Sequence, residues 1–312
     1  DGYYEKICKS RKVRSRRMKP MNILAIDIGG TSIKLGISDE KGNIVNFQEF
    51  DSQAKMGGNH LIERIIQLVK MNYVDFQAIG ISTAGQVNSK EGSIIYANDN
   101  IPNFTGMRLK SIFELNFNVP VAVENDVNAA ALGEKKFGAG KRYTDFLCLT
   151  YGTGIGGAIV YNSSIYRGFN GSAAEFGHII LYPGGRKCTC GFLGCYEVYG
   201  STTALVEKAL QVDHKYANGR AIFEGLERGN AELEKILNAW IMDVAYGLVS
   251  LTHIFNPPVI ILGGGVMEQD KLVSLVNSKV KELVMESYSD IEIVKATLGN
   301  KAGLLGAVSL HL

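Results

Sequence analysis

The sequence contains no apolar run that reaches the roughly 18 residues a membrane-spanning helix needs. Its first twenty residues also lack the apolar segment of about 7 to 15 residues that marks a signal peptide. Proline is scarce, at 6 of 312 residues, and charged residues make up 21%, which excludes a collagen-like or largely disordered chain. We therefore expect a soluble, cytoplasmic protein with no membrane partner and with enough length for two domains.

Excess positive charge is confined to the N-terminal end. The net charge is +2, but residues 1–20 hold eight Lys or Arg against two acidic residues, which leaves the rest of the chain at −4. A mildly acidic body is not typical of a nucleic-acid-binding surface, so no specific nucleic acid is expected as a partner. We interpret residues 1–20 as a basic tail that is disordered or not native; the alternative is a segment that binds nucleic acid or an acidic membrane surface.

Cysteine is rare, and its odd number, 5, argues against a disulfide framework. Three of the five fall within eight residues, as Cys188, Cys190 and Cys195, ten or more residues after His178. One His and three thiols form a complete tetrahedral set for Zn²⁺, and because no position is left for water, the predicted role is structural. The alternatives are a disulfide with a spare thiol and a histidine buried in the core.

Glycine, in contrast to proline and cysteine, is abundant: 36 of the 312 residues are glycine, well above the usual frequency of roughly 7%. The excess lies in short clusters, which is typical of places where the backbone approaches a ligand closely. The clusters are Gly29-Gly30, Gly152 to Gly157, Gly184-Gly185 and Gly263 to Gly265.

A strand, a glycine-rich turn and a second strand occur twice in the hydrophobic pattern. The first unit has strands at 23–26 and 33–37, and the second has strands at 146–150 and 158–161. Further strands are predicted at 44–50, 77–82, 119–124 and 259–262, and helices at 59–70, 107–116, 231–255 and from 302. These alternations predict an α/β protein with two related halves.

The domain change is expected near residue 121. We predict a small N-terminal α/β domain over 21–121 and a larger α/β domain over 122–301 that carries the zinc knuckle. The C-terminal helix, at about 302–312, is expected to pack back on the first domain.

The first glycine turn has the chemistry of a phosphate and Mg²⁺ site. Asp27 follows a strand, and the backbone N–H groups of Gly29, Gly30 and Thr31 can cradle phosphate while the carboxylate holds a hydrated Mg²⁺. We place Lys34 in the same group. The alternative is an ordinary hairpin turn, and the spacing fits neither the P-loop nor the dinucleotide pattern.

The second glycine turn matches the spacing of a dinucleotide-binding loop, but a strand and not a helix is predicted to follow it, which argues against NAD. Two glycine hairpins facing each other across a cleft suit the phosphates of ATP instead. The third cluster follows a buried strand and is either a nucleotide contact or an ordinary loop. The residues assigned to ATP in these two clusters are Gly152, Thr153, Gly154, Gly156, Gly264 and Gly265.

Asn125 and Asp126 lie between a predicted strand and a predicted helix. Either residue could simply cap the helix. The functional hypothesis is that Asp126 accepts the proton of an attacking hydroxyl while Asn125 orients the substrate, since phosphoryl transfer needs mainly a base, alignment and neutralised charge. Glu175 and Glu197 flank the metal set and, with His178, could bind sugar hydroxyls; otherwise they are surface glutamates.

Taken together, these motifs resemble the ROK family (repressor, open reading frame, kinase), and its sugar kinases in particular, over nearly all of 21–312. The resemblance implies an actin-like ATPase (ribonuclease H-like) fold of two domains around a cleft, with ATP, Mg²⁺ and a structural Zn²⁺. It also implies that Asp126 is the base on the primary hydroxyl of a sugar and that the protein is a homodimer. The implied sugar-binding residues are Gly85, Asn103, Asn125, Asp126, Glu175, His178 and Glu197.

One departure concerns the choice of sugar. Many sugar kinases of the family carry Pro-Gly where this chain has Ala84-Gly85, so the loop beside the sugar can differ. The leading hypothesis is an ATP-dependent, glucokinase-like hexose kinase that forms a sugar 6-phosphate. The alternatives are an N-acetylmannosamine or N-acetylhexosamine kinase, a β-glucoside kinase and a sugar-binding protein without catalysis. A sugar-responsive, DNA-binding repressor is the least favoured alternative, because the twenty residues before Met21 are too few for a helix-turn-helix domain.

Overall fold

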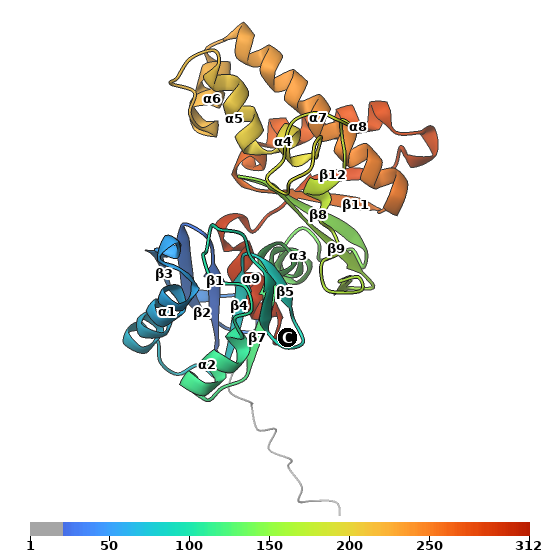
Figure 1. Ribbon diagram of the computed structural model, residues 1–312. Helices are drawn as coiled ribbons and strands as arrows, with labels where there is room; N and C mark the ends of the chain where they lie inside the picture. The colour runs from blue at the N-terminus through green and yellow to red at the C-terminus, as the bar shows by residue number, and fades with distance from the viewer. Residues whose placement is uncertain (1–20) are drawn as a thin grey trace, which may run out of the picture.

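Two five-stranded sheets form the framework of the molecule, one in its lower and one in its upper part (Figure 1). The computed structural model describes residues 21–312, so the interpretation of 1–20 as a basic tail lies outside the described residues. In that described part, none of the helices is long and apolar enough to span a membrane.

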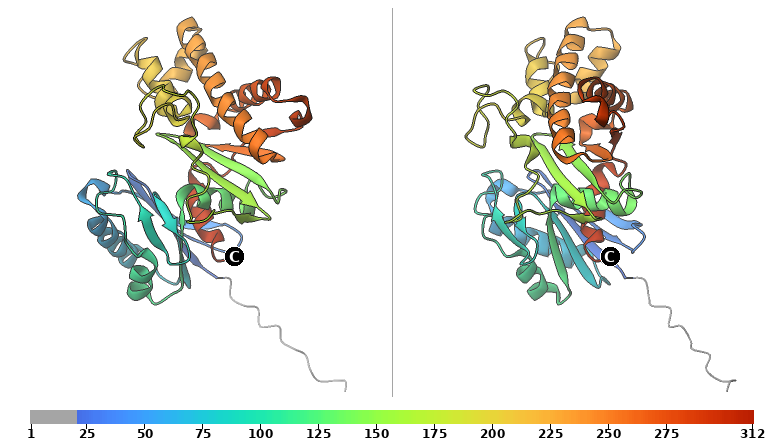
Figure 2. Two further views of the ribbon diagram at one scale, coloured as in Figure 1. Left: turned by 45° about the vertical axis from the view of Figure 1, so that its right-hand side comes forward. Right: turned by 90° about the vertical axis from the view of Figure 1, so that its right-hand side faces the viewer.

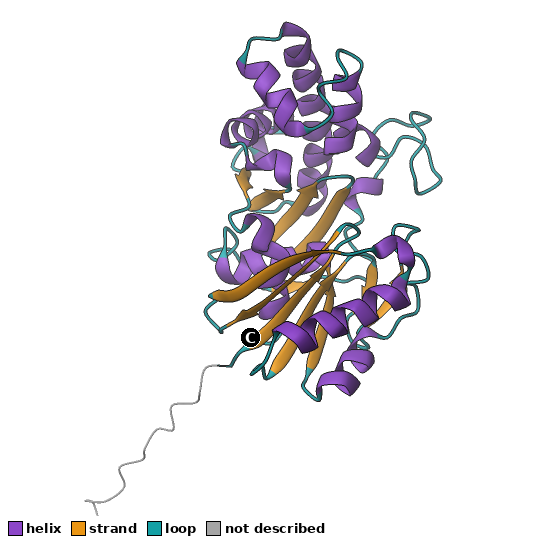
Figure 3. Ribbon diagram, turned by 90° about the vertical axis from the view of Figure 1, so that its left-hand side faces the viewer, coloured by secondary structure: helices purple, strands orange, loops and turns teal. Residues whose placement is uncertain are grey.

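The first sheet has the strand order β3-β2-β1-β4-β7. Strands β1 to β3 are antiparallel, whereas β4 and β7 run parallel to β1. Helices α1 and α2 cover one face of this sheet (Figure 3), and α1 buries Leu61, Ile62, Ile65 and Val69 against it. The bounds are β1 Ile23–Ile28, β2 Ser32–Ser38, β3 Ile44–Asp51, α1 Gly58–Asn72, β4 Ala78–Thr83, α2 Leu109–Phe117 and β7 Val121–Asn125.

The second sheet has the order β10-β9-β8-β11-β12, with the same pattern of antiparallel and parallel neighbours. The prediction of two related halves is therefore confirmed by topology. The helices that pack with the second sheet are grouped around α7, whose Trp240 is fully buried. The bounds are β8 Phe146–Tyr151, β9 Ile155–Tyr161, β10 Ser164–Ile165, α4 Glu197–Gly200, α5 Thr202–Leu210, α6 Gly219–Glu227, α7 Ala231–Phe255, β11 Val259–Gly263, α8 Asp270–Leu283 and β12 Glu292–Lys295.

Helices α3 (Asp126–Phe137) and α9 (Ala302–Ser309) lie between the two sheets and pack against each other (Figure 2). They follow equivalent strands, β7 and β12, in the two halves. Their backbones approach closely, because a Cβ on Gly306 would overlap the carbonyl of Ala129. Helix α9 also packs on β1 and β4, so the chain ends on the first sheet.

Most predicted strands and helices differ from the observed ones by one to three residues at an end, and two of the differences affect the cleft. Residues 122–125 were assigned to the larger domain, but they pair with β4 as part of β7 in the first sheet. Strand β9 begins at Ile155 and not at 158, because Gly156 and Gly157 pair with Thr150 and Leu149 of β8. Both glycines lie where a side chain would collide with neighbours, Gly156 with Val127 and Gly157 with Phe176, which explains glycine inside a strand.

A small hairpin, β5 (Gln86–Asn88) and β6 (Ser93–Tyr96), extends from the end of β4. Gly85 has φ +98°, and a Cβ there would lie 2.8 Å from the carbonyl of Tyr96. This turn therefore favours glycine. It brings the hairpin to the same end of the first sheet at which β7 passes into α3.

Candidate active site

A cleft of about 780 Å³ opens where the ends of both sheets meet the start of α3. It is bounded by the β4–β5 turn, the first turn of α3, the β8–β9 hairpin and the segment that carries the Cys/His group. Of the residues predicted for the site, those that line this cleft are Gly30, Gly85, Asn125, Asp126, Gly152, Thr153, Gly154, Gly156, Glu175, His178, Cys190, Glu197, Gly264 and Gly265.

Asp27 does not line the cleft but lies behind its first glycine turn. Its carboxylate accepts a hydrogen bond from Ser82 Oγ (2.8 Å) and lies 3.4 Å from Lys34 Nζ. Gly29, Thr31 and Lys34 likewise lie outside the lining residues, whereas Gly30 is part of them. The first glycine turn therefore faces the cleft through one residue, with Asp27 and Lys34 paired behind it.

The structure does not bring Asn103 to the cleft. It is exposed and has φ +57°, and among the described residues the neighbouring asparagines that line the cleft are Asn98 and Asn100. The assignment of Asn103 to the sugar stays a prediction, and Asn98 and Asn100 of the same loop line the cleft.

Asp126 is the first residue of α3 and reaches the cleft with a half-buried carboxylate. Burial, reinforced by the negative charge of Asp27, raises its pKa to about 6. The N–H of Val127 (2.9 Å) and Asn125 Nδ2 (2.8 Å) both donate to Oδ1 and partly oppose the shift. Such a carboxylate is ionised at neutral pH yet more basic than an ordinary aspartate, as a general base requires.

Asn125 is the N-cap of α3. Its Oδ1 accepts from the N–H groups of Val127 and Asn128, and its Nδ2 donates to the carbonyl of Gly85 (2.9 Å) and to Asp126. These four bonds use the full hydrogen-bonding capacity of the side chain. The observed contacts are thus those of a cap that orients Asp126, and a bond from Nδ2 to a substrate would have to replace one of them.

The β8–β9 hairpin is held to α4 and α5 by its own backbone. The carbonyl of Gly152 accepts from the N–H of Thr202 (3.0 Å), and Glu197 Oε2 accepts from the N–H of Ile155 (2.9 Å). A Cβ on Gly154 would overlap the carboxylate of Glu197. Glu197 is consequently no free surface residue, because one of its oxygens fixes the glycine hairpin while the side chain lines the cleft.

His178, Cys188, Cys190 and Cys195 offer one ligand atom each, and these atoms all lie within 4.8 Å of one another. Sγ of Cys188 is 3.7 Å from Nδ1 of His178, and Sγ of Cys190 is 3.5 Å from Sγ of Cys195. A tetrahedral Zn²⁺ with bonds of about 2.3 Å to sulfur separates its thiolates by about 3.7 Å. The donor set and its spacing therefore fit zinc, and they do not fit a disulfide.

His178 connects this group to the cleft. Because Nδ1 faces Cys188, the other ring nitrogen, Nε2, remains for the cleft, which the side chain lines. Binding of a metal to Nδ1 would place the proton of the neutral ring on Nε2 and make that nitrogen a donor.

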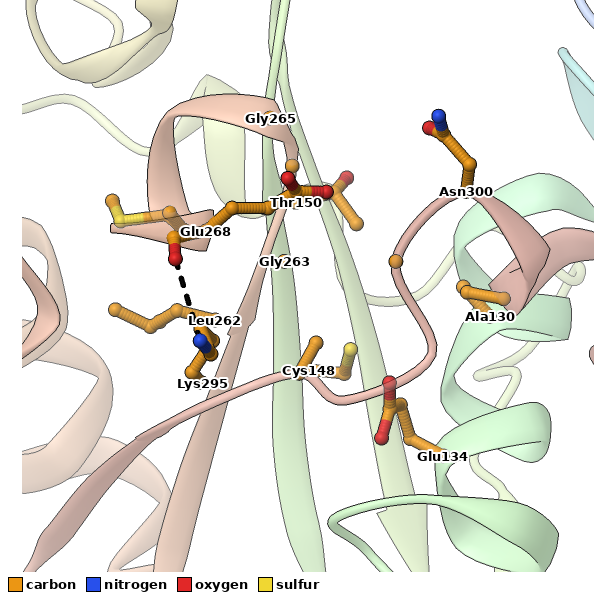
Figure 4. A pocket seen from close by; sticks show the side chains of 15 residues that line it. Ala130, Glu134, Cys148, Thr150, Leu262, Gly263, Gly265, Glu268, Lys295 and Asn300 are labelled. Carbon is orange, nitrogen blue, oxygen red and sulfur yellow. Dashed lines mark hydrogen bonds between the residues drawn. The ribbon is translucent and has the colours of Figure 1, made fainter. Parts of the chain in front are cut away.

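A second, smaller cavity of about 120 Å³ shares Thr150, Gly264 and Gly265 with the cleft. Figure 4 shows Glu134 of α3, Cys148 of β8 and Lys295 of β12 around it. Glu134 is buried, and its carboxylate accepts from the N–H groups of residues 139, 297 and 298 at 2.7 to 2.9 Å. It thereby joins α3 to the segment that leads into α9.

Some residues of the site were not predicted. Gln86 Nε2 donates to Glu175 (3.0 Å), and Arg167 forms two hydrogen bonds with the buried Glu124, at 2.6 and 3.2 Å. Both contacts join segments more than forty residues apart. No local spacing in the sequence signals such a pair.

The fold is that of the actin-like ATPases, because it has a duplicated sheet, crossing helices and a cleft bordered by two glycine hairpins.

The chain belongs to the ROK family, whose sequence profile matches residues 23–312. It is 35% identical over 311 residues to a glucokinase of Streptomyces coelicolor, covering 92% of this chain and 96% of that protein. A β-glucoside kinase of Listeria innocua is 34% identical over 294 residues, covering 92% and 96%.

Among solved structures, a ROK family glucokinase from Streptomyces griseus, in complex with glucose and AMPPNP, superposes with a TM-score of 0.82. It is 32% identical, and the match covers 93% of this chain and 98% of that one. The predictions of the fold, of the family and of a sugar kinase are confirmed by these matches.

Proposed function

We propose that this protein transfers the γ-phosphate of ATP to the 6-hydroxyl of a hexose, with glucose as the first sugar to test. The observation that carries the proposal is Asp126, a base with a pKa of about 6, in a cleft that the glycine hairpin and the Cys/His segment both border. The similarity to glucokinases over more than nine tenths of the chain supports the same reaction.

In the proposed reaction, Asp126 accepts the proton of the sugar hydroxyl as the hydroxyl oxygen attacks the γ-phosphorus and ADP leaves. The N-terminal position of Asp126 on α3 and its bond from Asn125 hold the carboxylate in one direction. Glu175, Glu197 and His178 supply acceptors and a donor for the other hydroxyls. Asn98 and Asn100, which line the cleft, are proposed for the sugar together with Asn103 of the same loop.

The glycine turns would hold the phosphates. The residues of the glycine clusters that line the cleft are Gly30, Gly152, Thr153, Gly154, Gly156, Gly157, Gly264 and Gly265. We propose that Asp27, whose charge already raises the pKa of Asp126, helps to hold Mg²⁺, since carboxylates are the oxygen ligands this ion prefers. The ion would neutralise the charge that develops on the phosphates.

The Cys/His group is proposed to bind Zn²⁺ with a structural role. Four protein ligands leave no open position for substrate or water. The ion would fix the segment 178–195 and, through Nδ1, the orientation of the His178 ring at the sugar.

A coupled ADP-release assay tests the proposal, with Mg-ATP against glucose, mannose, fructose, N-acetylmannosamine, N-acetylglucosamine and a β-glucoside. Sugar-dependent release of ADP is expected, and its absence across the panel would reject the kinase. The β-glucoside kinase relative favours a second candidate of the same class, a β-glucoside kinase, which preferential turnover of the glucoside would establish.

That the protein is a homodimer and that it is cytoplasmic both stay predictions. The proposed use of ATP supports the cytoplasmic location.

A further inference from the structure

The loop 166–175, which connects β10 to the Cys/His segment, is bound to the first half of the molecule at two separate places. Its position in the sequence assigns it to the second sheet, because β10 pairs with β9. Its side-chain contacts, however, reach β5 and β7.

The first contact is made by Gln86 at the start of β5. Its Nε2 donates to Oε1 of Glu175 (3.0 Å), and its Oε1 accepts from Oγ of Ser172 (3.2 Å). All three side chains line the cleft. Gln86 uses its donor and its acceptor at once, so its amide has a single orientation that satisfies both partners.

The second contact is the ion pair between Arg167 and Glu124. The Glu124 side chain is 1% exposed, and its other oxygen accepts from the N–H of Asn125 (3.0 Å), one residue before Asp126. The carbonyl of Arg167 accepts from the N–H of Ala173 (3.2 Å), which closes the loop on itself. Arg167 therefore fixes the start of the loop relative to the turn that carries Asp126.

Glu175 needs such support, because it is exposed and a glutamate has three rotatable side-chain bonds. Without a partner, its carboxylate would sample several rotamers, and binding of a sugar would carry the entropic cost of selecting one of them. The bond from Gln86 occupies part of Oε1 and leaves Oε2 for a hydroxyl in the cleft.

We infer that Gln86 is a positioning residue, which holds the carboxylate of Glu175 toward the sugar from the opposite half of the molecule. The inference rests on the proposed function and adds to it a residue that acts on sugar affinity through Glu175. Its effect should appear in the KM for the sugar and not in the KM for ATP, because the contact lies at the Glu175 side of the cleft.

The test is a double-mutant cycle with Gln86→Leu, Glu175→Ala, which removes the acceptor of the bond, and the combined variant, assayed by ADP release with the best sugar of the panel. Gln86→Leu should raise the KM for the sugar by about fivefold to tenfold, the usual effect of one lost hydrogen bond. The KM for ATP and the midpoint of thermal unfolding should stay near those of the wild type. In the Glu175→Ala background, where Gln86 has no carboxylate to hold, Gln86→Leu should change the sugar KM by less than about twofold.

Gln67→Leu, the same change on the exposed face of α1, is the matched control and should leave both KM values unchanged. An equal effect of Gln86→Leu in both backgrounds, or an equal rise in the two KM values, would overturn the inference while the kinase stands. A wild-type protein without sugar-dependent turnover would instead reject the proposed function, and the inference with it.

Discussion

At the scale of single residues, we expect the charge of Asp126 to be needed for turnover but to lower the free energy of unfolding. Asp126→Asn keeps an oxygen to accept from Asn125 and Val127 but removes the charge. We expect turnover to fall at least about 100-fold, since the base is lost. Because the pKa rises from 3.8 to about 6, the free energy of unfolding at pH 7 should increase by up to about 3 kcal/mol. Initial rates and urea unfolding measure the two effects.

The stability that Asp126→Asn adds should increase with pH. The folded protein binds the Asp126 proton more tightly than the unfolded chain does, so the wild type loses stability as pH rises from about 4 to about 6. The advantage of Asp126→Asn should grow over that window and level off above it, while wild-type kcat/KM should decline below about pH 6. The exposed Asp290→Asn is the control, and a gain that is equal at pH 4 and pH 7 would contradict the assignment.

Predictability differs from residue to residue for physical reasons. Asp126 and the Cys/His group were found because their chemistry lies in short local patterns. Asn103 was predicted from the resemblance to the family. The sequence does not show which asparagines of this loop line the cleft, because the backbone turn decides that. Gln86 gave no signal, since its partner is 89 residues away.

At the scale of elements, the segment 178–195 has little regular structure to hold it. Apart from isolated bridges, such as that between residues 180 and 195, it consists of turns, with positive φ at Gly191 and Gly194. Cys190→Ser removes one of the four ligands proposed for zinc, so we expect less bound zinc and a loss of at least about 2 kcal/mol in the free energy of unfolding. Sugar affinity should also fall, because His178 loses its orientation.

Metal analysis of the purified protein, thermal unfolding and sugar binding by calorimetry measure these effects. Cys148→Ala is the matched control, because Cys148 is a buried thiol of β8 outside the metal group, and its variant should keep a full complement of zinc. A Cys190→Ser protein with unchanged zinc content and unfolding midpoint would refute the ligand assignment.

The crossing of α3 and α9 depends on glycine. A Cβ on Gly306 would overlap the carbonyl of Ala129, and one on Gly133 would lie 2.8 Å from the carbonyl of Ala302. Gly306→Ala should therefore force the helices apart and cost about 2 kcal/mol or more in urea unfolding. Gly219→Ala, at the start of α6 with open space around it, should be neutral or slightly stabilising. Equal stability of the two variants would show that the crossing tolerates a methyl group.

At the scale of the whole molecule, the duplicated topology was predictable because each half repeats the strand, glycine turn and strand pattern. Buried strands such as β1 and β8 carry continuous apolar runs that identify them locally. How the halves join was not predictable in detail, because the contacts of α3 with α9 and of Glu134 with the β12–α9 segment span more than 160 residues. That these contacts lie next to the cleft follows only from the fold.

The ion pair of Arg167 with Glu124 shows how one such contact can hold the halves together. Arg167→Met would leave the carboxylate of Glu124 buried without its cation, and because Arg167 is itself 38% exposed, we expect a loss of about 2 kcal/mol. Glu124→Gln combined with Arg167→Met removes the buried charge as well, while the amide oxygen can still accept from Asn125 and Asn128. The double variant should therefore regain part of the lost stability in urea unfolding. If it is less stable than Arg167→Met alone, the cost lies in lost packing of the arginine and not in an unpaired charge.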